Sequence, residues 1–421
     1  MPTPPSTRPP TALTGGFLGS VGRVFEVLKI FTRLGLTSFG GPTAHLGYFR
    51  DEFVTRRKWM TEKEYADLVA LCQFMPGPAS SQVGMAIGYR RAGYPGMLAA
   101  WVGFTMPSVI ALVAFALGVA QLGDISGAGW LAGLKAAAVA VVAHAVLGMS
   151  RSIVTDRVRA AVALAAFLVV LLVPSPLAQV GAIAVGMLAG VSLFAGKGAG
   201  EAGGAAESGG GAAAAPVKTS SRAAGATALA AFAGLLVILP AAAGAVKSTG
   251  LDIFDSFYRA GALVFGGGHV VLPLLEQATV PTGLVDHDTF LAGYGAAQAV
   301  PGPLFTFASF LGASAQGVPW WWGAILATVA IFLPAALLVI GVMPFWDRIR
   351  SQPVASLALS GANAAVVGIL AAALYNPVFT AGITGAGTMA IAAAAFVALQ
   401  EWKVPAWAVV VAAALVGWVA L

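Results

Sequence analysis

The sequence predicts an all-α polytopic membrane protein made of two homologous halves, with inverted topology and with re-entrant or broken helices at Pro-Gly-Pro and Phe-Gly-Gly motifs. Three observations predict it. Long apolar runs recur along the chain, two motifs occur twice at constant spacing, and equivalent loops of the two halves carry opposite charge.

The apolar runs give the class of protein. Of the 421 residues, 58% are hydrophobic and only 10% are charged, whereas a soluble domain has about 25% charged residues. Runs at 160–173, 181–194 and 223–239 are almost free of charge and approach the roughly 20 residues that a helix needs to cross hydrocarbon. They are continuous and not alternating, which excludes an outer-membrane barrel. Several such runs predict a multi-pass protein in the lipid bilayer.

The repeated motifs indicate a tandem duplication. The segment from Phe31 to Gly41, which ends in Phe-Gly-Gly, returns as 257–267 with the same Phe, Arg, Gly and Phe-Gly-Gly positions. Gln73-Phe-Met-Pro-Gly-Pro78 returns as Gln298-Ala-Val-Pro-Gly-Pro303 in the same order along the chain. The motifs predict four parts: a disordered cytoplasmic tail at 1–20, an N-terminal repeat at 21–196, a flexible Gly/Ala linker at 197–222 and a C-terminal repeat at 223–421.

Charge placement predicts that the halves are inverted. Residues 50–63 contain five Lys or Arg residues, whereas the equivalent 276–288 contain three acidic residues and no basic one. Basic loops stay in the cytoplasm, so the two loops should lie on opposite sides of a bacterial inner membrane. The basic residues behind the net charge of +6 cluster beside apolar runs, which is typical of membrane topology and excludes nucleic acid as a partner.

The same reasoning divides the chain into crossing and returning segments. Residues 62–91 have basic flanks at both ends, so they should enter the membrane and return. The Phe-Gly-Gly segments, about 21–46 and 252–275, should also cross incompletely. The segments expected to cross once are 95–120, 130–149, 158–174, 176–196 and 223–246.

The Pro-Gly-Pro motifs are the first candidate binding elements. Proline and glycine destabilise a helix interior by about 3 and 1 kcal/mol relative to alanine, so the helix should break there. A break leaves amide N–H groups unpaired at the next helix N-terminus, where they can bind an anion. The alternative is kinks for close packing. The substrate-binding candidates from these motifs and from Phe-Gly-Gly are Pro76, Gly77, Pro78, Ser80, Pro301, Gly302, Pro303, Gly40, Gly41, Gly266 and Gly267.

Three side-chain types complete the candidate site. Arg33 and Arg259 occupy equivalent apolar positions, where an arginine is costly, and their guanidinium groups suit a divalent oxyanion; snorkelling to the interface is the alternative. Gln73 and Gln298 could bind substrate or tie helices together. Histidines titrate near neutral pH, so those nearest Phe-Gly-Gly, His45 and His269, are the proton-coupling candidates.

Enzyme classes find no support. The chain has no GxxxxGK[ST] loop, no HExxH and no Gly-x-Ser-x-Gly, so neither a nucleotide-driven pump nor a hydrolase is expected. Its single cysteine, Cys72, allows no disulfide and no cysteine metal cage. We expect no cofactor and no metal.

The two motif pairs, together with Arg56-Arg-Lys-Trp59 and Phe265-Gly-Gly-Gly-His269, resemble the chromate ion transporter family, long two-domain type. The resemblance covers nearly the whole chain outside the tail and linker. It implies a bacterial inner-membrane carrier that exports chromate, confers resistance and couples to protons, with Arg33, Arg259 and the motif residues at the site. Pro42 is replaced by Gly268 in the second copy, so the copies need not contribute equally. A sulfate-type carrier, an anion channel and a homodimer stay open.

Overall fold

The computed structural model describes residues 17–39, 41–121, 128–173, 176–194, 221–265, 270–345 and 353–421. All regular structure in these ranges is helical, which confirms the predicted class. The first half comprises α1 (Phe17–Thr37), α2 (Gly41–Arg50), the short π-helix η1 (Asp51–Arg56), α3 (Glu62–Phe74), α4 (Ala79–Gln121), α5 (Gly129–Ile153), α6 (Arg157–Leu172) and α7 (Pro176–Leu193).

The second half repeats this order with more interruptions. An additional helix, α8 (Arg222–Ala245), comes before it and has no counterpart among the described residues of the first half. The second half then comprises α9 (Thr249–Leu263), α10 (Val271–Thr279), α11 (His287–Ala299), η3 (Leu304–Thr306), α12 (Phe307–Ser314), α13 (Trp320–Val342), η4 (Met343–Phe345), α15 (Pro353–Ala373), η5 (Leu374–Phe379), α16 (Thr380–Gly382), α17 (Ala386–Gln400) and α18 (Ala406–Ala420).

Helix lengths agree with a membrane protein. Among the described residues, five helices are long and apolar enough to cross a membrane: 79–121, 129–153, 222–245, 320–345 and 356–382. The longest, α4, contains non-helical backbone at Ala92 and Gly93, so it consists of a first segment before this break and a longer second one after it. The predicted crossing segment 158–174 corresponds to α6, which has only 16 residues.

The two Pro-Gly-Pro motifs interrupt their helices at equivalent places. Helix α3 begins with Thr61, which caps the amide of Glu64, and α11 begins with the equivalent Asp286, which caps the amide of Thr289. Both helices end in an extended residue, Met75 or Val300, because the residue before a proline disfavours helical backbone. The predicted helix breaks are therefore present in both halves.

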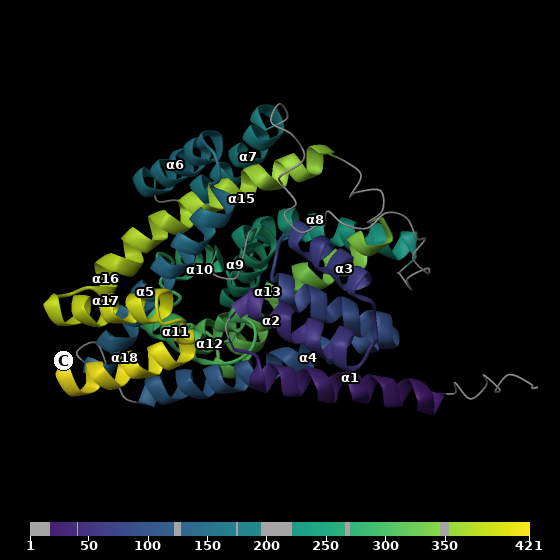
Figure 1. Cartoon of the computed structure of the whole chain (residues 1–421), viewed down its shortest axis with the longest axis horizontal. Helices are drawn as coiled ribbons and strands as arrows, with labels where there is room; N and C mark the ends of the chain where they lie inside the picture. Colours follow the sequence, from purple (N-terminus) through teal and green to yellow (C-terminus); the bar gives the residue numbers. More distant parts are fainter. Residues whose placement is uncertain are drawn as a thin grey trace, which may run out of the picture.

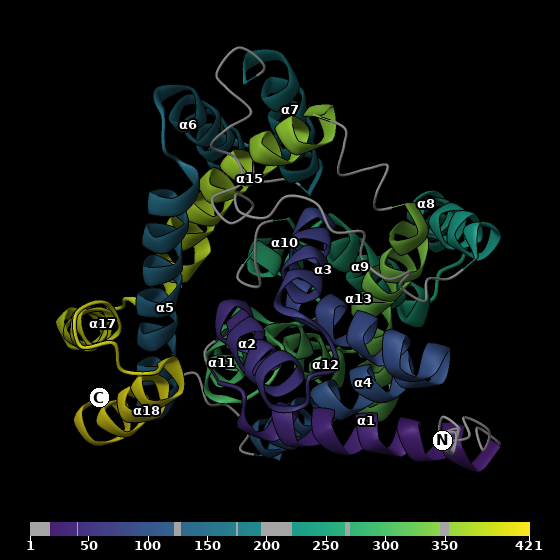
Figure 2. The same cartoon turned by 45° about the vertical axis from the view of Figure 1, so that its right-hand side comes forward.

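Each half docks its helices onto the other half. Helices α6 and α7 pack against α15, and in the same way α17 and α18 pack against α5, the helix that corresponds to α15. Figures 1 and 2 both show these two groups outside a central body formed by α1–α4 and α9–α13. The halves are thus interlocked, and a continuous core of buried residues draws on both of them.

The interlocking is closest at the Pro-Gly-Pro turns. The amide of Gly77 donates a 2.7 Å hydrogen bond to the carbonyl of Val264, which precedes the second Phe-Gly-Gly. In the equivalent contact, Gly302 donates a 2.9 Å bond to the carbonyl of Ser38, which precedes the first. Each Pro-Gly-Pro turn therefore binds the Phe-Gly-Gly segment of the opposite half.

Only glycine fits these turns. Gly77 and Gly302 have φ values of 111° and 100°, which side chains strongly disfavour. A Cβ atom on Gly302 would lie 2.2 Å from the Ser108 hydroxyl oxygen, which donates a 2.5 Å hydrogen bond to the carbonyl of Pro301. The first motif is held in a similar way, because Gln82 Nε2 donates a 2.7 Å bond to the carbonyl of Pro76.

We expect Gly302→Ala to destabilise the protein by roughly 3 kcal/mol, because backbone strain and the clash with Ser108 add. Gly283→Ala is the matched control: Gly283 also has a positive φ of 73°, but its Cβ would meet nothing within 4 Å. Thermal unfolding in detergent compares the two variants. Equal losses of melting temperature would contradict the packing role of the turn.

Candidate functional site

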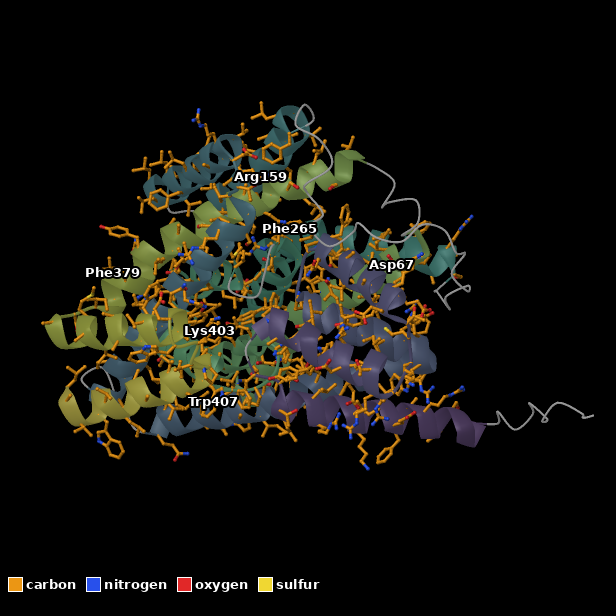
Figure 3. The ribbon with its side chains drawn as sticks, in the orientation of Figure 1. Asp67, Arg159, Phe265, Phe379, Lys403 and Trp407 are labelled. Atoms are coloured by element: carbon orange, nitrogen blue, oxygen red, sulfur yellow. The ribbon has the colours of Figure 1, made fainter. Side chains whose placement is uncertain are left out.

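A cavity of about 470 Å³ lies where the second Pro-Gly-Pro turn meets the first Phe-Gly-Gly segment. Gly41 and Pro42 at the start of α2 form one wall, and Gln298 and Gly302 form another. The polar lining is completed by His144 of α5, by Gln400 at the end of α17 and by Lys403 from the loop between α17 and α18. Figure 3 labels Lys403 together with Trp407 of α18. Both halves of the chain therefore contribute to this cavity.

The polar groups of the cavity are suited to an anion. No carboxylate is among the described residues that line it, and in the described ranges Lys403 has no ion-pair partner. The buried Nε2 atom of Gln298 has no hydrogen-bond partner in the described part of the chain. A buried donor without an acceptor is costly, and an oxyanion in the cavity would satisfy it.

Lys403 also has unusual backbone geometry. Its φ is 52°, a left-handed conformation that a non-glycine residue adopts at an expense of about 1–2 kcal/mol. Such strain occurs most often at functional positions. The loop places Lys403 beside Gln400, whose Oε1 accepts a 3.2 Å hydrogen bond from His144 Nδ1.

The C-terminal helices α17 and α18 hold the Lys403 side of the cavity against the first half. Trp407 packs on Phe39 of the Phe-Gly-Gly motif, with ring centroids 5.6 Å apart. On the other side of α5, Lys135 forms a 2.5 Å ion pair with Asp288 at the start of α11. Helix α5 therefore contacts α11 and both C-terminal helices, and its His144 faces the cavity that they enclose.

The structure brings only some of the predicted substrate-binding residues into this cavity. Gln298, Gly302 and Gly41 line it, whereas Gln73, the counterpart of Gln298, is exposed on α3. Pro301 and Pro303 flank Gly302 in the turn. Pro76, Gly77, Pro78 and Ser80 lie at the other Pro-Gly-Pro turn and do not line this cavity. Gly40, Gly266, Gly267 and His269 lie outside the described residues.

The two predicted arginines form ion pairs. Arg33 Nη2 lies 2.5 Å from Glu52 Oε2, and Arg259 makes two hydrogen bonds, of 3.0 and 2.6 Å, with Asp255. Neither arginine is among the residues that line the cavity. An arginine that is paired with a buried carboxylate has less charge to offer an anion, so the free cation at the cavity is Lys403. Sequence reasoning missed Lys403; its only signal was an isolated basic residue before Pro405 in an apolar C-terminal segment.

Glu52 is the centre of a charged cluster in the first half. Its side chain is only 5% exposed and contacts Arg33, Arg56 and Arg57. Burial alone would raise the pKa of Glu52, but the hydrogen bonds from Arg57 and Arg33 outweigh burial and lower this pKa below its ordinary value. Glu52 therefore holds three arginines of the first half with one buried carboxylate.

His45, a predicted proton-coupling residue, is buried beside the first Pro-Gly-Pro turn. Its Nδ1 lies 3.3 Å from the hydroxyl of Ser80, and its Nε2 lies 3.2 Å from the carbonyl of Ser38. That carbonyl is the one that accepts the bond from Gly302. His45 therefore connects the first turn to the contact that holds the second.

These features define a class of protein: a multi-pass membrane transporter of two interlocked repeats, with an anion-compatible cavity at their junction. The chain belongs to the chromate transporter family, whose model matches residues 25–192 and again 251–418.

Named relatives agree with this assignment. A chromate transport protein of Pseudomonas aeruginosa is 30% identical over 93% of this chain and 91% of its own length. A probable chromate transport protein of Synechococcus elongatus is 28% identical over 83% of each chain, and a chromate transport protein of Cupriavidus metallidurans is 26% identical over 89% of this chain and 86% of its own. No solved structure matches this chain.

We expect Glu52→Ala to destabilise the protein by about 2 kcal/mol, because Arg33 and Arg56 lose the carboxylate that they pair with in the described structure and Arg57 keeps only Glu26. The partial exposure of the arginines keeps the loss below that of a fully buried pair. Asp51→Ala is the control, since Asp51 is adjacent but 76% exposed. The pKa of Glu52 in the folded protein lies below its ordinary value of 4.5. The ionised Glu52 side chain therefore stabilises the fold fully above pH 4.5, and this stabilisation is lost as the pH falls through the lowered pKa. Unfolding of both variants at neutral and acidic pH measures this; similar losses would refute the role of Glu52.

Proposed function

We propose that the protein exports chromate across the bacterial inner membrane, driven in part by protons, and thereby gives chromate resistance. The observation that supports this most is the cavity between the halves, whose lining includes an unpaired lysine and an amide donor without an acceptor. A tetrahedral oxyanion would accept hydrogen bonds from Gln298 and offset the charge of Lys403. Membership of the chromate transporter family supports chromate as that anion.

Electrostatics supports export as the direction of transport. Moving one charge through a membrane potential of 100 mV changes the free energy by about 2.3 kcal/mol. For a dianion this amounts to about 4.6 kcal/mol per 100 mV, and a cell interior is negative. Exit of chromate is therefore favoured by the potential, whereas accumulation would need an additional driving force.

We further propose that the halves have opposite orientation in the membrane. Helix α8 supports this. If each repeat crosses the membrane an even number of times, as the four crossing segments expected in the first repeat imply, one additional crossing between the repeats gives the second repeat the opposite orientation. The opposite charge of the equivalent loops at 50–63 and 276–288 supports it as well. Alternating access would then come from rocking one interlocked half against the other around the cavity.

A sulfate-type carrier is the second candidate. The donors of the cavity would bind any tetrahedral dianion of similar size, since neither an amide nor an ammonium group distinguishes the central atom. A channel is a third possibility, because backbone dipoles and lysines also line anion pores. Competition and saturation kinetics separate these functions from chromate export.

We expect Lys403→Ala and Gln298→Leu each to reduce chromate export by about tenfold or more, because each removes a hydrogen-bond donor or a charge that binds the anion. The measurement is chromate accumulation in sensitive bacteria that express each variant, with membrane levels matched by immunoblot. Lys247→Ala is the control for charge, since Lys247 is exposed on the loop before α9. Gln73→Leu tests the equivalent glutamine outside the cavity.

Export that is unaffected by both cavity variants would contradict the proposed site. Unchanged chromate accumulation in cells with the wild-type protein would contradict export itself. Accumulation that rises and is blocked by sulfate would make the sulfate-type carrier the better hypothesis, and flux without saturation would favour a channel.

A further inference from the structure

A second polar pocket, of about 60 Å³, lies where α6 and α7 of the first half pack against α10 and α15 of the second half. It is enclosed by the ends of α6 and α10, by α7, and by the junction of α15 with η5. Its polar lining consists of Gln179, Glu276, Gln277 and Asn376. The backbone of Asn376 is non-helical, so the helical segment is interrupted at this wall.

The elements around this pocket correspond to those around the anion cavity. Helix α10 is the counterpart of α2, α15 of α5, and the α6–α7 pair of the α17–α18 pair. The duplicated arrangement of helices thus encloses two polar spaces, and each of them is lined by residues of both halves. Their chemistry is opposite: the first is lined by Lys403 and unpaired donors, whereas the second is lined by a carboxyl group and amide side chains.

Glu276 has no counter-ion in the described part of the chain. Its side chain is only 9% exposed, and it forms no ion pair among the described residues. The carboxylate form of such a group is unfavourable, because burial removes its hydration and no cation replaces it. The protonated form removes the charge and adds one hydrogen-bond donor.

Gln179 supplies an acceptor for that donor. It is 2% exposed, and its Nε2 donates to the carbonyl of Pro273 on α10 at 3.4 Å. This bond directs the amide so that its buried Oε1 atom has no hydrogen-bond partner among the described residues. The isolated carboxyl group and the unpaired amide oxygen line the same pocket, and one proton on Glu276 would satisfy both.

The neighbouring helices bring few competing charges. Helices α7 and α15 contain no charged residue within their bounds, and η5 contributes only the exposed phenol Tyr375. Helix α6 has its arginines, Arg157 and Arg159, in its first turn, whereas the pocket is at its C-terminal end. Helix α9 carries Asp252, Asp255 and Arg259, of which the last two pair with each other.

We propose that Glu276 binds the proton that moves inward as chromate moves outward, with Gln179 accepting the hydrogen bond of the protonated carboxyl group. This inference rests on the proposed export function and assigns its coupling ion to a residue. A proton fits better than a transition-metal ion, because the described residues include no cluster of three or more acidic, histidine or cysteine side chains. A sodium ion, which carboxylate and amide oxygens can bind, is the alternative that the test separates.

The pocket is linked to the hydrogen bonds that join the Pro-Gly-Pro turn of one half to the Phe-Gly-Gly segment of the other. Helix α10 follows the second Phe-Gly-Gly, and the carbonyl of Val264 just before that motif accepts the bond from Gly77. Protonation changes the charge and hydrogen bonding at the far end of α10. A shift of this helix would therefore reach the contact between the first Pro-Gly-Pro turn and the second half.

The test uses the full-length protein in proteoliposomes, with both sides kept at pH values where chromate is fully deprotonated. An acidic lumen should drive chromate accumulation by the wild-type protein. Glu276→Gln mimics the protonated state, so it should lose the response to the pH gradient while tracer exchange of chromate at equal concentrations continues. Glu276→Asp should keep the response, and Glu401→Gln, which removes an exposed carboxylate, is the control.

Each outcome decides one question. If the wild-type protein moves no chromate at all, the proposed function fails, whatever the role of Glu276. If the wild-type protein responds to the pH gradient and Glu276→Gln responds equally, Glu276 is not the proton site. If a sodium gradient drives the wild-type protein and a pH gradient does not, the coupling ion is not a proton and the proposal is overturned. If Glu276→Gln fails to fold, Glu276→Asp decides the question. Its response to the pH gradient must persist but with a shifted pH midpoint, and an unshifted midpoint would overturn the proposal.

Discussion

The structure depends on two reciprocal hydrogen bonds, from Gly77 to the carbonyl of Val264 and from Gly302 to the carbonyl of Ser38. Each joins the broken helix of one half to the broken helix of the other, at positions related by the internal repeat. Backbone that leaves a helix inside a membrane protein must find partners within the protein, because lipid offers none. The two halves meet this requirement for each other, so each half depends on the other for its fold.

These two reciprocal hydrogen bonds explain why the anion cavity forms between the halves. A turn that must dock on the opposite half brings with it the polar groups beside it, here Gln298 on α11 and the start of α2 at Gly41. The packing of α17 and α18 on α5 then adds Lys403 and His144 from two further elements. A site built in this way can change shape whenever the halves move relative to each other, as alternating access requires.

The two halves share one arrangement of helices, but they differ in the polar residues at equivalent positions. Ser108, which donates to the carbonyl of Pro301, has Ala335 as its counterpart, and Gln82 performs the equivalent role for Pro76. Gln298 lines the cavity while Gln73 is exposed. Duplication supplied two copies of one scaffold, and differences at a few positions made the two polar spaces between them unlike: one is lined by Gln298 and Lys403, the other by Glu276. A single anion site with a separate coupling site is consistent with that divergence.

Much of the fold could be predicted because its signals are local or repeated. Apolar runs identify the helices, and Pro-Gly-Pro marks the breaks wherever it occurs. The candidate site was harder to predict, because it depends on which helices of one repeat pack against which helices of the other. Arg33 is next to no acidic residue in the sequence, yet it pairs with Glu52 nineteen positions later; Lys403 reaches the cavity only because α18 packs on the first half. Neither contact has a signature in the spacing of one sequence.

Expression of the two halves as separate polypeptides tests the interlocking most directly. The chain would be divided within 195–220, so that α8 stays with the second half, and only one half would carry an affinity tag. The account predicts that the tagged half recovers the untagged half in equal amount from detergent, with chromate transport retained, and that Gly302→Ala prevents this recovery. Recovery of either half alone as a stable, folded protein would contradict it.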